Sequence, residues 1–471
     1  AEALPGGPSQ TLRALELGTL HSLDGASPVT QTVLEWLEHR SSESTMDQPI
    51  PAKAPLLEHL SPLPPEDLLS LSTEIARSLA IRHSSNEFGG LLGARRLEDG
   101  SVELGPAEES NQAEDVRLAL RRVAELAIGR LPKEEVVADR ELLAFLPALV
   151  EAPAPEWMAV AARALCGDIQ LRPQDALDLW EQMELARATE RVRSHAPQRA
   201  GLKLEVAHDT HIGLLKSRMG QTNQDAVFWQ TEGSISLLIV ADGISVSTAG
   251  SGNLASAILV QVIASRWESD LEQLREATEP EIHEFLDQAL ADANQAICES
   301  SLRMAGGDLT RHIPMGTTVV MAIVRGDRVH LAALGDSRAY LVGSYGAAQL
   351  TADQNLRCEW LRSWQNNQPF DLLNEGYALV GYAGHFDEEG LPAPVPALHR
   401  RLTMLPGESL VLCSDGLNDY ATTNPAEMAR FLEEATAQPD LGAACRGLVE
   451  KANAGGGGDN VTVLIARPLP L

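Results

Sequence analysis

Four aspartates stand at the ends of apolar runs, each beside small or turn-forming residues. They are Asp225 in TNQDAV, Asp242 in LLIVADGIS, Asp415 in LVLCSDGLND and Asp459 in GGGGDNVTV. Gly or Asn follows three of them, so the backbone can turn sharply and direct the carboxylate out of a sheet. Four carboxylates brought together cannot all stay ionised unless a cation neutralises them. Oxygen ligands of this kind suit Mg²⁺ or Mn²⁺, so the C-terminal half is predicted to be a metal-dependent hydrolase.

The composition excludes several other classes of protein. The chain has 471 residues, enough for two or three domains, and its 44% hydrophobic content predicts a packed core. A net charge of −29 argues against a nucleic-acid binder. Five scattered cysteines without a CxxC pair indicate free thiols in a reducing compartment. With no apolar run near the ~20 residues of a membrane helix and no signal peptide pattern, we expect a cytoplasmic protein without membrane or nucleic-acid partners.

The pattern of the chain changes near residue 200, so we predict one domain over 1–200 and another over 201–471. The first part is rich in Leu, Ala, Glu and Arg at helical spacing. We expect a loop over 41–56 and a hairpin around Asp99-Gly100 within 93–105. The helices expected in this part cover 64–83, 113–130, 155–166 and 172–193.

The second part is rich in strands separated by long helices, which predicts two sheets or one mixed sheet packed against helices. The segment 356–399 reads as irregular and aromatic-containing, long enough for a functional flap. The expected helices are 250–266, 278–305, 424–436 and 440–453. The expected strands are 202–208, 225–230, 235–241, 317–325, 328–334, 338–343, 400–404, 409–414 and 461–467.

Seven motifs in order, NQDA, VADG, GTT, ALGDSRAYL, LTADQN, LCSDGLND and GGGDNVTV, resemble the type-2C metal-dependent protein phosphatases, the PPM family. The resemblance covers roughly residues 205–468. It implies an α/β/β/α sandwich that dephosphorylates phosphoserine or phosphothreonine on a protein. The implied chemistry is in-line attack of a metal-bound hydroxide without a phosphoenzyme, with two ions ~4 Å apart activating water and clamping charge. The implied partners are a phosphorylated protein substrate and a cognate Ser/Thr kinase or its targets.

The resemblance also implies the ligands of two Mn²⁺ or Mg²⁺ ions. Asp242 would bridge both ions, and the Gly243 carbonyl would be a further ligand. Asp225 would help to hold one ion, while Asp415 and Asp459 would hold the other. The alternative for each aspartate is an ordinary turn or cap residue.

Further motif residues match less central positions of the family. Asp336 and Asp419 match positions that can hold a third, weaker metal, and a purely structural role is the alternative for both. The Gly316-Thr317-Thr318 segment and Arg338 match positions with an architectural role.

The chain departs from the family pattern beside the first two aspartates. The usual acid before the first aspartate is Gln224 here. The usual DGxGG is replaced by DGISV over 242–246, so two glycines are lost and a bulkier loop is expected. Ile244 stands where many relatives have a histidine, and it cannot transfer a proton.

The family usually grips the substrate phosphate with an arginine that is Gly220 in this chain. Lys216 and Arg218 lie close by and are our candidate replacements. Lys216 follows Gly213 at the usual spacing and is slightly favoured, although a lysine would orient phosphate less strongly than arginine. A solvated surface role is the alternative for both.

The N-terminal half resembles a degenerate protein-kinase C-lobe, on TLRALELGTLHSLDG, TVLEWLEHRS, EDGSVELG, AEDVRLALRRVAELAIGRLP and the closing PEWMAVAARALCGDIQLRPQDALDLWEQM. The kinase chemistry is missing. No Gly-rich loop or Val-Ala-Ile-Lys strand precedes it, HSSNEFGGLLG lacks His-Arg-Asp, and LGPAE replaces Asp-Phe-Gly. The resemblance implies a pseudokinase that regulates the phosphatase domain. The alternative for the whole chain is a phosphatase-like binding module with weak or no turnover.

Overall fold

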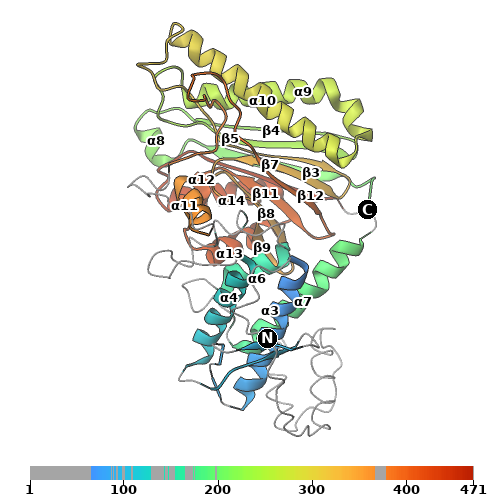
Figure 1. Ribbon diagram of the computed structural model, residues 1–471. Coiled ribbons are helices and arrows are strands. Elements are labelled where there is room, and N and C mark those ends of the chain that lie inside the picture. Colours follow the sequence, from blue (N-terminus) through green and yellow to red (C-terminus); the bar gives the residue numbers. More distant parts are fainter. Residues whose placement is uncertain are drawn as a thin grey trace. The chain divides into compact units, whose positions relative to one another are not determined.

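The computed structural model describes residues 199–365 and 378–469 continuously, most of 65–128 and 154–196, and two positions between those stretches (Figure 1). The chain divides into two compact units. One contains residues 1–133 and 160–191, and the other contains residues 134–159 and 192–471. The sequence before residue 65 that contributes to the kinase resemblance, and the loop expected over 41–56, lie outside the described residues.

The N-terminal unit is mainly helical where it is described. Its α3 buries Leu68, Leu71, Ile75 and Leu79, the positions whose spacing predicted an amphipathic helix. The expected hairpin is confirmed as two short antiparallel strands. The elements are α3 (Pro65–Ser84), β1 (Arg95–Arg96), β2 (Val102–Glu103) and α4 (Gln112–Ile128), together with the second half of α6 (Pro155–Ala164) and most of α7 (Ala176–His195). Both α6 and α7 have residues in each unit.

The C-terminal unit contains two five-stranded sheets in which every paired strand is antiparallel. The first sheet has the order β10 (Leu398–Thr403), β7 (Arg328–Leu334), β6 (Val319–Arg325), β5 (Ile235–Asp242), β4 (Asp225–Glu232). The second has the order β3 (Leu204–His211), β12 (Val461–Pro468), β11 (Ser409–Cys413), β8 (Arg338–Gly343), β9 (Gly346–Gln349). All the predicted strands form, and the short β9 was missed.

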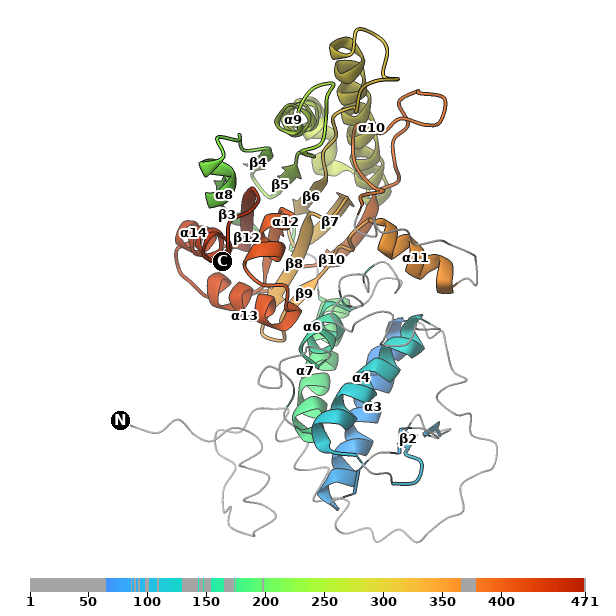
Figure 2. The ribbon, with the colours of Figure 1, turned by 90° about the vertical axis from the view of Figure 1, so that its left-hand side faces the viewer.

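Two pairs of helices cover the outer faces of the sheets, so the four layers can be followed in Figure 2. The first pair, α9 (Gly252–Glu276) and α10 (Glu279–Met304), shares a core with alternate residues of β5, including Ile235, Leu237 and Ile239. The second pair, α13 (Pro425–Thr436) and α14 (Leu441–Ala454), packs on β11 and β12. The predicted α/β/β/α sandwich is therefore confirmed for this unit.

Three helices were not predicted: α8 (Leu214–Arg218), α11 (Leu356–Gln365) and α12 (Asp415–Tyr420). The expectation that 356–399 is irregular was wrong at its start, because Cys358 and Leu361 are buried one helical turn apart in α11. Residues 366–377 of this segment lie outside the described residues, and residues 378–397 form only isolated bridges, among them Thr317 with Ala383. The flap itself stays a prediction.

No helix in the described stretches is both long and apolar enough to cross a lipid bilayer. The cytoplasmic location stays a prediction.

Candidate active site

Strand ends from both sheets bring the predicted acids together. Asp225 begins β4 and lies directly opposite Asp242, which ends β5. Asp415 opens α12 immediately after β11, and Asp459 lies just before β12. Residues far apart in the sequence thus meet where the two sheets face each other.

Asp242 lies at the centre of this acid cluster. Its carboxyl group lies close enough to those of Asp225 and Asp415 for their charges to act on it. Burial, followed by the charges of Asp225 and Asp415, raises the pKa of Asp242 well above its usual value. Burial and the nearby Asp336 raise the pKa of Asp415 in the same way. The fold therefore holds several carboxyl groups where their charges oppose one another.

Two oxygens of the cluster are buried and have no hydrogen-bond partner among the described residues: Oδ1 of Asp225 and Oδ1 of Asp415. The other oxygen of Asp225 accepts hydrogen bonds from Ser414 Oγ at 2.8 Å and Thr462 Oγ1 at 2.7 Å. Burial raises the pKa of Asp225 to about 6, and these two hydroxyls oppose that rise. The hydroxyls fix the carboxylate so that one oxygen is left for another ligand, such as a hard cation.

The acids approach one another in pairs. No group of three His, Cys, Asp or Glu in the described stretches is arranged to hold a metal ion as it stands. The pairs nevertheless have the donor chemistry that a divalent cation needs, because buried oxygens without a hydrogen donor gain most from a positive charge.

The two acids matched to a third metal lie beside the main cluster. Burial and the charge of Asp353 raise the pKa of Asp336 to about 7, and Asp419 adds to this effect. Burial also raises the pKa of Asp419. Arg338 forms a two-pronged ion pair with Asp353, with both N–O distances 2.8 Å, so this arginine orders a neighbouring acid.

The backbone after Asp242 is held by the Gly-Thr-Thr segment. The Thr317 hydroxyl and the Thr318 amide each donate to the Asp242 carbonyl at 2.8 Å. A side chain at Gly243 would overlap the backbone of Gly252, and a Cβ at Gly252 would lie 2.7 Å from Gln224 Nε2. Gly252 therefore allows its backbone to approach that of Gly243 closely, beside the acids. The chain lacks the two later glycines of the family's DGxGG pattern, and the role of Gly252 was not predicted from the sequence.

The two predicted phosphate-binding cations lie in different surroundings. Lys216 is only 7% exposed. Its ammonium group contacts the Asp459 carboxylate and lies 3.3 Å from Asn460 Oδ1 and 3.5 Å from Gln224 Oε1. Arg218, at the end of α8, is exposed. The structure thus brings Lys216 to the acid cluster and leaves Arg218 outside it.

Several polar residues that support the site were not singled out from the sequence. They include Ser414 and Thr462, which bind Asp225, and Asn460, which accepts a hydrogen bond from the Gln224 amide at 2.9 Å. Ser245 donates to Gln224 Oε1 at 2.6 Å. Ser414 and Asn460 adjoin Asp415 and Asp459, and Thr462 and Ser245 lie three residues after Asp459 and Asp242. A polar residue close to a motif aspartate was the available signal.

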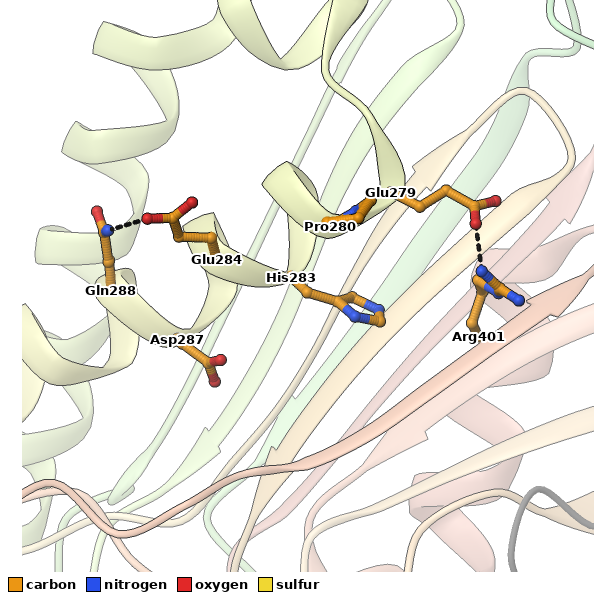
Figure 3. A pocket seen from close by; sticks show the side chains of 7 residues that line it. All are labelled: Glu279, Pro280, His283, Glu284, Asp287, Gln288 and Arg401. Atoms are coloured by element: carbon orange, nitrogen blue, oxygen red, sulfur yellow. Dashed lines mark hydrogen bonds and ion pairs between the residues drawn. The ribbon is translucent and has the colours of Figure 1, made fainter.

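A separate pocket of about 500 Å³ lies between α10 and β10, and its lining residues are shown in Figure 3. One lining residue, His283, packs against two further imidazoles. The ring of His283 lies 5.6 Å from that of His330 and 5.2 Å from that of His399, centroid to centroid. His399 Nε2 is hydrogen-bonded to Asp287 at 2.7 Å, whereas neither ring nitrogen of the buried His330 has a partner in the described part of the chain. None of the predicted site residues lines this pocket.

Comparison with known proteins agrees with the family resemblance of the motifs. The family model for protein phosphatase 2C matches residues 212–444. The serine/threonine phosphatase stp of Listeria innocua is 30% identical over 239 residues, which cover 49% of this chain and 84% of the relative. PstP of Mycobacterium tuberculosis, a serine/threonine protein phosphatase, is 29% identical over 276 residues, covering 57% of this chain and 46% of the relative. The chain belongs to the protein phosphatase 2C (PPM) family and is a serine/threonine protein phosphatase.

A solved structure was also matched, that of the PstP catalytic domain in complex with two manganese ions. It is 25% identical and covers 57% of this chain and all of that one, with a TM-score of 0.43.

Proposed function

We propose that this chain removes phosphate from phosphoserine or phosphothreonine in proteins with the help of two Mn²⁺ or Mg²⁺ ions held by the acid cluster. The observation that carries the proposal is the position of Asp242, which lies opposite Asp225 in the sheet and close enough to Asp415 for the charges of both acids to act on it. Beside it lie two buried carboxylate oxygens with no hydrogen donor among the described residues. A pair of divalent cations satisfies these oxygens and removes the repulsion between the acids.

Each acid has a place in the proposed metal site. Asp242 would lie between the two ions, with the Gly243 carbonyl beside it. Asp225 would hold one ion and is oriented by Ser414 and Thr462. Asp415 and Asp459 would hold the other ion. Asp336 and Asp419 would hold a third, weaker ion.

The bound ions would supply a nucleophile formed from water at neutral pH and positive charge for the phosphoryl oxygens. The protein's own side chains hold the reacting groups in place. The Thr317 hydroxyl and the Thr318 amide fix the backbone at Asp242. Arg218, which is exposed, and Lys216, at the acid cluster, are the candidates for orienting the substrate phosphate. Ile244 cannot act as a proton donor, so protonation of the leaving group falls to solvent.

The test is release of phosphate from a phosphothreonine peptide in the presence of Mn²⁺. Asp242→Asn should lower kcat by at least ~100-fold, because one residue contributes to both ions. The matched control is Asp308→Asn, an exposed aspartate in a turn, which should keep full activity. Equal activity in the wild type and Asp242→Asn would refute the assignment of the site.

A binding module with little turnover is the second candidate. It is favoured by one observation, the contact between the Lys216 ammonium and Asp459, which places a cation of the protein itself at a proposed metal ligand. In that case the chain would bind a phosphopeptide and Mn²⁺ without releasing phosphate. Single-turnover measurements with a labelled phosphopeptide separate the two functions.

We also propose that the N-terminal region, with its resemblance to a degenerate kinase lobe, regulates the phosphatase. The family match begins at residue 212, so this region is additional to the catalytic part. A truncation that removes residues 1–133 takes away the first segment of the N-terminal unit and keeps both Glu156 and Arg193, which belong to the C-terminal unit. Deleting residues 1–133 should change kcat/KM, and an unchanged value would exclude regulation by that segment.

A further inference from the structure

Lys216 is buried on a helix whose other side chains are mostly exposed. Lys216 is 7% exposed, whereas the neighbouring Leu214 and Leu215 are 41% and 48% exposed. A surface helix usually turns its apolar side chains towards the protein core and its lysine towards water. The reverse arrangement indicates that the position of the ammonium group is determined by its partners.

The backbone of α8 is fixed to the loop that carries Asp459. The Leu215 amide donates to the Gly457 carbonyl at 2.8 Å, and the Leu214 amide donates to Asn453 Oδ1 at 3.0 Å. Gly213 has a φ of +85°, and a Cβ there would overlap the Asp459 carbonyl. The helix and the acid therefore keep a fixed separation, and the Lys216 side chain spans it.

The partners of Lys216 are all oxygens at the edge of the acid cluster. They are the carboxylate of Asp459 and the side-chain oxygens of Gln224 and Asn460. Asp459 is also the more exposed end of the cluster, with 33% of its side chain accessible. One carboxylate of the cluster is thus already neutralised by a charge of the protein itself, and a neutral Gln224 lies next to it.

We propose that the Lys216 ammonium is a built-in counter-charge at the Asp459 end of the site, so that the two metal ions bind with very unequal affinity. The ion held by Asp225 and Asp242 binds tightly. The ion that needs Asp459 must displace the ammonium group and is repelled by it, so it binds weakly and makes activity dependent on metal concentration. This inference rests on the proposed function, because it concerns the same metal site.

The test is calorimetric titration of the full chain with Mn²⁺, accompanied by the electron paramagnetic resonance signal of the bound ion. The wild type should show one tight and one weak binding step, with a mononuclear Mn²⁺ signal at one equivalent. Lys216→Gln should tighten the weak step by ~10-fold or more, because a full positive charge next to the ion is removed. The tight step should change little.

Two matched variants control for charge and for the helix. Lys216→Arg keeps the positive charge and should keep the weak step weak. Arg218→Gln removes one positive charge from the same helix, but at an exposed position, and should change either step by less than ~2-fold. If Lys216→Gln fails to fold, as judged by circular dichroism, Lys216→Met retains the apolar stem without the charge and replaces it.

The outcomes distinguish this inference from the proposed function. Equal affinities for both ions in the wild type, or the same titration curve for the wild type and the neutral Lys216 variants, would overturn the inference and leave the metal site intact. The absence of Mn²⁺ binding in every variant would overturn the proposed function and the inference with it. If the weak step tightens in the neutral Lys216 variant but not in Lys216→Arg or Arg218→Gln, the result would support the proposed function and this inference.

Discussion

Replacing Arg193 with alanine should destabilise the C-terminal unit by about 3–5 kcal/mol, because it would leave two buried carboxylates without their partner. Arg193 is 9% exposed, and its guanidinium group donates to Glu156 Oε1 at 2.6 and 3.0 Å and to Glu408 Oε2 at 2.9 Å. Glu156 and Glu408 are 0% and 3% exposed. The Tyr345 hydroxyl, 3.3 Å from the guanidinium group, completes the buried network.

The magnitude follows from what remains after the substitution. Burial already raises the pKa of Glu156, and the charge of Arg193 opposes that rise. Without the arginine the two buried carboxyl groups lose the positive charge that lies between them, and this loss lowers stability. The cost should fall substantially when Arg193→Met is combined with Glu156→Gln and Glu408→Gln, because no buried charge is then left unpaired.

The assay is urea unfolding followed by circular dichroism. A loss of about 3 kcal/mol should move the final unfolding midpoint by at most about 1 M of urea for a unit of this size, because the dependence on urea steepens with size. Arg430→Ala is the control, because the ion pairs of Arg430 with Glu427 and Glu434 are exposed and their loss should change stability by less than ~0.5 kcal/mol. A loss below ~1 kcal/mol for Arg193→Ala would refute the reasoning that the buried network holds these segments together.

Three further outcomes are expected. Burial lowers the pKa of His330 to about 4, so this imidazole binds a proton more readily in the unfolded chain than in the folded one. The free energy of unfolding should therefore fall by at most roughly 3 kcal/mol as the pH drops from ~6.5 towards 4. His330→Leu should flatten that part of the pH profile of unfolding. Gly252→Ala should lower both thermal stability and kcat, because the new Cβ would lie 2.5 Å from the Gly243 carbonyl oxygen, whereas Gly447→Ala, with open space around it, should do neither. Ser414→Ala should weaken binding of the tight Mn²⁺ ion by ~10-fold in calorimetry, because Asp225 loses one of its two hydroxyl donors; unchanged binding would contradict that role.

The central strands could be predicted from the sequence because they are apolar runs, such as ISLLIVAD in β5 and VVMAIVR in β6. The strand expected over 317–325 forms at Val319–Arg325, and that expected over 235–241 forms at Ile235–Asp242. The convergence of Asp225, Asp242 and Asp415 was likewise foreseeable, since each lies at one end of such a run. Helices of five to ten residues, such as α8 and α11, were missed because they are too short for a clear helical period.

The position of Lys216 could not be read from its neighbours in the sequence. It depends on hydrogen bonds from α8 to Gly457 and Asn453, which lie more than two hundred residues further along the chain. The role of Gly252 was hidden for a related reason. Its close approach to Gly243 depends on the path of the intervening loop, which no local pattern specifies. Tertiary contacts of this kind decide which polar residues reach the acid cluster.

The central claim is that the acid cluster is a metal site that hydrolyses phosphoserine or phosphothreonine. Its most direct test is phosphate release from a phosphothreonine peptide by the full chain, with Mn²⁺ and with EDTA, beside an Asp242→Asn/Asp415→Asn double variant. We expect turnover with Mn²⁺ that EDTA abolishes and that the double variant lacks, while its fold, measured by circular dichroism, is retained. Equal phosphate release with EDTA, or by the folded double variant, would contradict the claim.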